Sequence, residues 1–344
     1  MSEANSKRAI YTGVLVACLA IAAVVIVVRM DTTGQSGNGL GETFTYSVTD
    51  WIHSDPSKIG FVETDAIPTD FTNASAIAVD AGGRIYVAGG RGVRAVGPGA
   101  GARWEMGAAP RCIAVDACGT VYAGMTDHVE VFGPDGKRRA AWPASASNAL
   151  LTAVAVASNS VYVADARGRE VVQYALDGSV VNRIPGFIVP SPYFDLLVAP
   201  DGRLWVVDPG QHRIQTYGAD MKEVASWGQP SLDLDGFSGC CNPAYIAMLP
   251  NGDLVTSEKG LRRVKVHAPD GKFVCLVAGP DVLGSGETSA GEAIPADGAA
   301  ESSACPVAVD RAGRVLVLDA HRGEIRVFVP KAPAGPSGAV EVKP

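Results

Sequence analysis

The main pattern along the chain is a motif that repeats six times. Each copy has an apolar stretch, a polar turn centred on Gly or Asn and a second apolar stretch, often ending at an acidic residue. The copies begin at Ile77, Ile113, Val154, Leu196, Ala247 and Val307. Their turn residues are Gly83, Gly119, Asn159, Gly202, Gly252 and Gly313. The spacing predicts units of about forty residues, the length of a four-stranded propeller blade.

A third strand follows the second in each unit. Residues 208–217 and 319–328 show it best, with an acidic residue, a turn containing Gly or His, and then an apolar strand. The endings Arg-Ile-x-x-Tyr at 213–217 and Ile-Arg-Val-Phe at 325–328 resemble those of NHL repeats. The resemblance covers residues 59–330 and implies an all-β, six-bladed β-propeller. Units one and two depart from the pattern after their second strands, so their third strands are less well defined.

The ring needs one more strand to close. Unit six supplies three strands before Pro330, while residues 59–67 form a strand that belongs to no unit. We predict that this strand completes blade six, because an unpaired edge would expose backbone groups. An open solenoid is the alternative.

One uncharged apolar run, residues 9–28, is long enough to cross the hydrocarbon core of a bilayer. Lys7 and Arg8 precede it and only Arg29 follows, so the run predicts a signal anchor with the propeller on the extracytoplasmic side. The membrane is then one partner of the protein. Lipidation of Cys18, which ends a lipobox-like Leu-Val-Ala-Cys, and a cleaved signal are the alternatives.

These patterns divide the chain into five parts. Residues 1–8 are a cytoplasmic tip, 9–28 the transmembrane anchor and 29–58 a polar linker rich in Gly, Ser and Thr. The propeller spans 59–330, and the proline-containing residues 331–344 form a flexible tail.

Composition narrows the function further. Hydrophobic residues make up 47% of the chain and charged residues 19%, which excludes a disordered chain. The net charge of -7 argues against a nucleic-acid partner. Nucleotide-binding loops and a Cys-x-x-Cys-His haem motif are absent from the sequence, so the cofactor is left open, with a metal ion as one candidate.

Strand direction alternates within a blade, so the loops entering the first strands share one face with the turns between strands two and three. We call this the entry face. Four cysteines lie at or before first strands and are predicted to lie on it: Cys112, Cys240, Cys241 and Cys305. Cys118 lies in the opposite turn, roughly 20 Å from Cys112 along an extended strand, which excludes a disulfide between the two.

The richest candidate site on the entry face combines thiols, an amide, a carboxylate and an amine. Its residues are Cys240, Cys241, Asn242, Glu258, Lys259 and Cys305. Thiolates bind soft metals and undergo exchange, so a metal or redox site is one interpretation. The favoured interpretation is a disulfide from Cys240 or Cys241 to Cys275 or Cys305, which would staple the loop; unpaired thiols are the third.

Two functions follow as expectations. The resemblance to NHL propellers implies a membrane-anchored scaffold that binds a protein or small ligand on its rigid face, a role that needs no catalytic residues. The alternative is a metal-binding or redox-accessory propeller, including a hydrolase or lyase, because related propellers carry an axial metal. That chemistry needs convergent carboxylates, amides or histidines, which the sequence does not bring together.

Overall fold

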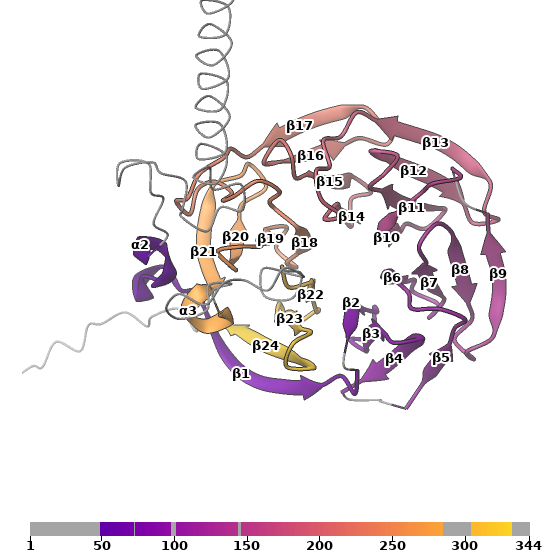
Figure 1. Cartoon of the computed structure of the whole chain (residues 1–344), viewed down its shortest axis with the longest axis horizontal. Helices are drawn as coiled ribbons and strands as arrows, with labels where there is room; N and C mark the ends of the chain where they lie inside the picture. The colour runs from indigo at the N-terminus through magenta and orange to yellow at the C-terminus, as the bar shows by residue number, and fades with distance from the viewer. Residues whose placement is uncertain (1–48, 72, 98–100, 144–145, 285–303, 332–344) are drawn as a thin grey trace, which may run out of the picture. The chain divides into compact units, whose positions relative to one another are not determined.

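The fold is a six-bladed β-propeller, seen in a computed structural model that describes residues 49–71, 73–97, 101–143, 146–284 and 304–331 (Figure 1). Six four-stranded antiparallel sheets surround an axis, with their first strands innermost. The predicted six-bladed architecture is therefore confirmed.

The first three blades follow one another along the chain. Blade 1 contains β2 (Ala74–Val79), β3 (Ile85–Gly89), β4 (Gly92–Val96) and β5 (Arg103–Glu105). Blade 2 contains β6 (Cys112–Val115), β7 (Val121–Gly124), β8 (Val129–Phe132) and β9 (Arg138–Trp142). Blade 3 contains β10 (Leu151–Val156), β11 (Ser160–Asp165), β12 (Glu170–Ala175) and β13 (Val180–Pro185).

The other three blades complete the circle. Blade 4 contains β14 (Leu196–Val198), β15 (Leu204–Asp208), β16 (Arg213–Tyr217) and β17 (Glu223–Trp227). Blade 5 contains β18 (Tyr245–Met248), β19 (Leu254–Ser257), β20 (Val264–His267) and β21 (Phe273–Ala278). Blade 6 contains β22 (Val307–Val309), β23 (Val315–Asp319), β24 (Glu324–Pro330) and β1 (Phe61–Pro68).

Short-range sequence signals explain the hairpins. The five predicted turn glycines adopt φ between 76° and 91°, a conformation that glycine reaches without steric cost. The second strand of every blade is buried along its whole length, since both of its faces pack against neighbouring sheets. The third strands of units one and two, whose sequence pattern is weak, also form, as β4 and β8.

Tryptophans at the outer strands join successive blades. Trp142 of blade 2 packs on Gly178 of blade 3, where a Cβ would lie 2.3 Å from the indole. Trp227 of blade 4 packs in the same way on Gly271 of blade 5. A side chain at either glycine would displace the ring.

The ring closes as predicted. Strand β1 pairs with β24 from Phe61 opposite Pro330 to Pro68 opposite Glu324. Arg326, whose side chain is 4% exposed, holds Glu63 of β1 through two hydrogen bonds of 2.6 and 2.7 Å. The first and last segments of the propeller therefore form one sheet.

The predictions for the two ends of the chain fall largely outside the described residues. The tip at 1–8, the anchor at 9–28, most of the linker and the tail from residue 332 lie there. Among the residues that the structure does describe, none of the helices is both long and apolar enough to span a bilayer. The end of the linker forms α2 (Thr49–Ile52) and a 3-10 turn (Pro56–Lys58), and α3 (Pro280–Leu283) follows β21.

We expect the closing ion pair to stabilise the propeller. Glu63→Gln leaves the buried guanidinium of Arg326 without its carboxylate, and the free energy of unfolding in urea should fall by about 2 kcal/mol. The exposed Glu105→Gln on the outer strand β5 is the matched control and should change it by less than about 0.5 kcal/mol. Equal stabilities for the two variants would contradict this role.

Candidate functional site

The centre of the entry face is hollow. The starts of the first strands and the adjacent loops and turns surround a cavity of about 570 Å³, which we call the axial mouth. Its polar and aromatic lining residues are Asn73, Ser75, Arg111, Thr126, Thr152, Tyr193 and Tyr245. A narrower cavity of about 120 Å³, which shares five of the residues around the mouth, extends inward to Asp195. The lining comes from all six blades, so ring closure is what assembles the site.

Arg111 supplies the only charged side chain among the described residues that line the axial mouth. It directly precedes β6, and its Nε donates a hydrogen bond of 3.2 Å to the carbonyl of Leu151 in the next blade. The residue is exposed, and no carboxylate of the described chain lies within salt-bridge distance of its guanidinium. The mouth thus presents an unneutralised positive charge.

Asp195 lies deeper, immediately before β14. Ile246 of blade 5 donates its backbone N–H to Oδ2 over 2.8 Å, which joins two first strands. The residue keeps some surface toward the cavity, but protein encloses the carboxyl group, and this desolvation raises the pKa of Asp195 to about 7. A carboxyl group that titrates near neutrality therefore lies beneath the positive mouth.

Two tyrosines form an aromatic wall of the mouth. The rings of Tyr193 and Tyr245 meet edge to face with centroids 5.9 Å apart. Burial raises the pKa of both phenols, and the Asp195 carboxylate adds to the rise at Tyr245, so both remain neutral. The Lys259 ammonium lies 5.2 Å from the centroid of Tyr193, a cation–π distance.

The sequence analysis placed the first-strand loops on one face but took its candidate residues from the cysteine loop, the turn at Glu258 and Lys259, and Cys305. Arg111, Asp195 and Tyr245 stand at or directly before a first strand and were missed. Their position ahead of the apolar first strand was the available signal.

The predicted cysteine site is partly assembled. Cys240 is exposed, Cys241 is buried, and their Sγ atoms lie 3.3 Å apart. Asn242 ties this loop to blade 5, since its side-chain amide donates to the carbonyls of Ser238 and Lys259 and accepts from the N–H of Lys259. Lys259 turns its ammonium toward the hydroxyl of Ser191, at 3.3 Å.

The expected disulfide staple is not formed, because all six cysteines of the described residues are free thiols. Cys305 is buried and accepts a hydrogen bond of 2.8 Å from the guanidinium of Arg262. Cys275 lies on the outer strand β21 against Gly60, in the segment before β1. Cys275 and Cys305 therefore make other contacts and are not bonded to Cys240 or Cys241.

Glu258 is buried and binds the loop that carries Cys240 and Cys241. Its buried carboxylate contacts the guanidinium of Arg263 at 3.0 Å and the ammonium of Lys265 at 2.8 Å. It also accepts hydrogen bonds from the backbone N–H and hydroxyl of Ser238. The two cations lower the pKa of Glu258 to about 2 against the opposing effect of burial, which is the largest single influence.

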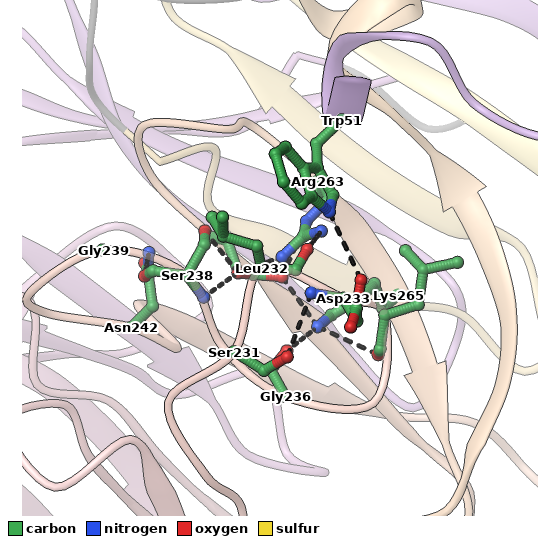
Figure 2. Close-up of polar contacts among 12 residues, drawn as sticks. Trp51, Ser231, Leu232, Asp233, Gly236, Ser238, Gly239, Asn242, Arg263 and Lys265 are labelled. Atoms are coloured by element: carbon green, nitrogen blue, oxygen red, sulfur yellow. Dashed lines mark hydrogen bonds and ion pairs between the residues drawn. The ribbon is translucent and has the colours of Figure 1, made fainter. Parts of the chain in front are cut away.

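The same two cations fix the loop before the cysteines (Figure 2). Arg263 donates to the carbonyl of Leu232 over 2.6 Å, and Lys265 donates to the carbonyl of Gly236. Trp51 donates its indole N–H to Asp233 of this loop over 3.3 Å. All the hydrogen-bonding capacity of Glu258 is directed into this network, so its role in the structure is to position the loop.

The donor groups do not fit the axial metal that related propellers imply. Asp195 is the only carboxylate lining the inner cavity within the described residues, and Arg111 lines it too. Elsewhere in the described chain, no three His, Cys, Asp or Glu side chains converge as a metal ion would require.

Comparisons with known proteins bear on the fold. The sequence matches no protein-family model and no curated protein. The solved structures that are similar include a streptogramin B lyase, with 11% identity and a TM-score of 0.55, covering 79% of this chain and 98% of that one. Another is a catalytically inactive virginiamycin B lyase from Staphylococcus aureus with quinupristin, with 10% identity and a TM-score of 0.53, covering 76% and 82%. At this identity the likeness shows the propeller fold alone, and the NHL relationship stays a prediction.

The position of Glu258 generates a pH prediction. Its pKa is lowered in the folded state, so the stabilisation is complete above the ordinary value of 4.5 and is lost as the pH falls toward about 2. Glu258→Gln should lower the free energy of unfolding at pH 7 by about 3 kcal/mol, because two buried cations lose their counter-ion. It should also reduce the loss of stability between pH 5 and pH 3, relative to the unsubstituted chain.

The control is Glu223→Gln, on the exposed strand β17, where the carboxylate accepts a hydrogen bond of 2.6 Å from Gln215. It should change stability by less than about 1 kcal/mol. Urea denaturation across this pH range measures both variants. An unchanged acid profile in Glu258→Gln would refute the structural role.

Proposed function

We propose that the protein is a ligand-binding propeller, held at the extracytoplasmic side of a membrane by residues 9–28, and that its axial mouth binds an anionic ligand with an aromatic or apolar body. The single observation that carries this proposal is the unneutralised Arg111 beside the tyrosine wall of the mouth. The proposal refines the scaffold role expected from the sequence.

The size and chemistry of the mouth support a small ligand. A volume of about 570 Å³ lies within the range of small-molecule sites, which are mainly apolar with a few polar groups that fix orientation. Here Arg111 would bind the anionic group, while Tyr193 and Tyr245 would contact its apolar body. Guanidinium groups form strong charge-assisted hydrogen bonds with carboxylates, phosphates and sulfonates.

The larger cavity of about 640 Å³ on the opposite face is a weaker candidate. Its carboxylates are already used in turns: Asp80 accepts from Gly82, Arg84 and Tyr86, and Asp310 binds Arg314. The exposed Arg311 also lines this cavity, but it lies there with two carboxylates and without any aromatic residue among the described lining residues. The axial mouth combines Arg111 with two tyrosines and, in the part of the chain that the structure describes, no carboxylate, which favours it for an anionic aromatic ligand.

A second candidate function is acid–base catalysis, and Asp195 is the observation that favours it. Its enclosed carboxyl titrates near pH 7, where a group can both donate and accept a proton. Similar structures include proteins described as streptogramin B and virginiamycin B lyases. A ligand recovered chemically altered after incubation with the protein would favour this function over binding alone.

The binding proposal is tested with 8-anilinonaphthalene-1-sulfonate, an anionic aromatic dye that fluoresces in apolar sites. Arg111→Gln should weaken its binding about tenfold, the effect of losing one charge-assisted hydrogen bond. Arg111→Lys keeps the positive charge and should retain part of the affinity. Fluorescence titration measures the dissociation constants.

Arg311→Gln is the matched control, since this exposed arginine lines the cavity on the opposite face. It should leave the dye affinity unchanged within about twofold. Equal affinities for Arg111→Gln and Arg311→Gln would rule out the axial mouth as the binding site.

A further inference from the structure

Cys240 and Cys241 are neighbours in the sequence, and their sulfur atoms also lie close together. They lie on the entry face, in the loop between β17 and β18. Their Sγ atoms are 3.3 Å apart, and Cys240 is exposed while Cys241 is buried. One sulfur can therefore meet a reagent from solution while the second lies behind it.

The surrounding loop holds the two sulfurs in this arrangement. The carbonyl of Gly239 lies 2.6 Å from Nε2 of His212, a residue of blade 4. Asn242, on the other side of the pair, is buried and bonded to Ser238 and Lys259. Anchors on both sides fix the backbone, so the approach of the sulfurs is built into the fold.

Charge around the pair acts in two directions. The hydrogen bond with Cys241 is the main cause that raises the pKa of Cys240, while the nearby Lys259 ammonium lowers it. The resting pair is therefore a dithiol in which the S–H group of one cysteine donates a hydrogen bond to the sulfur of the other. Its thiolate fraction, and with it its reaction rate, should increase with pH.

We propose that Cys240 and Cys241 form a redox site that is oxidised by low-molecular-weight disulfides through thiol–disulfide exchange. The Cys240 thiolate attacks one sulfur of the disulfide, forms a mixed disulfide and releases one thiolate. Cys241 then loses its proton and attacks Sγ of Cys240, which forms the Cys240–Cys241 bond and expels the second thiolate. The pair gives up two electrons, and the reagent takes these electrons and the two protons to become two thiols.

The other cysteines of the described residues lack this combination. Burial raises the pKa of Cys112 to about 12, and Cys305 is buried against Arg262. Cys275 is half-buried on β21. Cys118 is exposed but stands alone on the opposite face, so it can form a mixed disulfide but cannot resolve it.

The product would be easily reduced. Consecutive Cα atoms lie about 3.8 Å apart, below the usual span of about 4.4–6.8 Å for a disulfide, so a bond between neighbours is strained. Strained, exposed disulfides are the labile ones. The site is therefore suited to reversible oxidation and not to a permanent structural bond.

The site adjoins the axial mouth but does not depend on its function. Asn242 binds the backbone of Lys259, and Lys259 lies over Tyr193 of the mouth. Oxidation would change the loop that positions these residues. The test below reads sulfur chemistry alone, so its outcome is independent of ligand binding.

The experiment treats the full chain with oxidised glutathione and analyses peptides by mass spectrometry under conditions that preserve disulfides. The peptide with Cys240 and Cys241 should lose two hydrogen atoms and carry no glutathione, whereas Cys118 should gain one glutathionyl group. Dithiothreitol should reverse both changes. In Cys241→Ser, the mixed disulfide on Cys240 should persist because no second thiol resolves it.

In Cys240→Ser, the buried Cys241 should stay unmodified over the time in which Cys118 reacts completely. Urea denaturation of both variants verifies that they fold. Persistent glutathionylation of the unsubstituted pair, or no change in it once Cys118 has reacted fully, would overturn the proposal.

Discussion

The pairing of β1 with β24 is the constraint on which the rest of the structure depends. Strand β24 would otherwise present an open edge, and blade 6 would lack its outer strand. Arg326 is buried and needs a carboxylate, which Glu63 supplies from the other end of the propeller sequence. Closure also fixes the distances across the axis, because the first strands of all six blades can surround one cavity only in a complete ring.

The axial site follows from that closure. Arg111, Asp195 and Tyr245 come from blades 2, 4 and 5. They line one cavity because the closed ring places the strands of these blades around the axis. The result is a positive mouth above an enclosed carboxyl group, with aromatic rings at one side. The fold therefore provides both a cavity and an electrostatic preference for the occupant.

The sequence predicted what local chemistry determines. Turn glycines such as Gly83 and paired apolar stretches specify hairpins from neighbouring residues alone, and the strand before unit one had no other edge to complete. The cysteine loop was placed correctly on the entry face, but the partners of Glu258 were missed. Arg263 and Lys265 converge on it only through packing of blade 5 against the preceding loop. The expected disulfide is not formed, because both of its possible partners make other contacts: Cys275 lies against Gly60, and Cys305 accepts a hydrogen bond from Arg262.

The most direct test of the axial site is the pH dependence of dye binding at Asp195. The sulfonate of 8-anilinonaphthalene-1-sulfonate stays ionised. Among the described residues that line the two cavities, the group that changes charge near neutrality is the carboxyl group of Asp195, whose pKa is raised to about 7. Affinity should fall as the pH rises through 7, when the ionised carboxylate repels the dye, and this fall should be absent in Asp195→Asn. The same pH profile in both proteins would contradict the account.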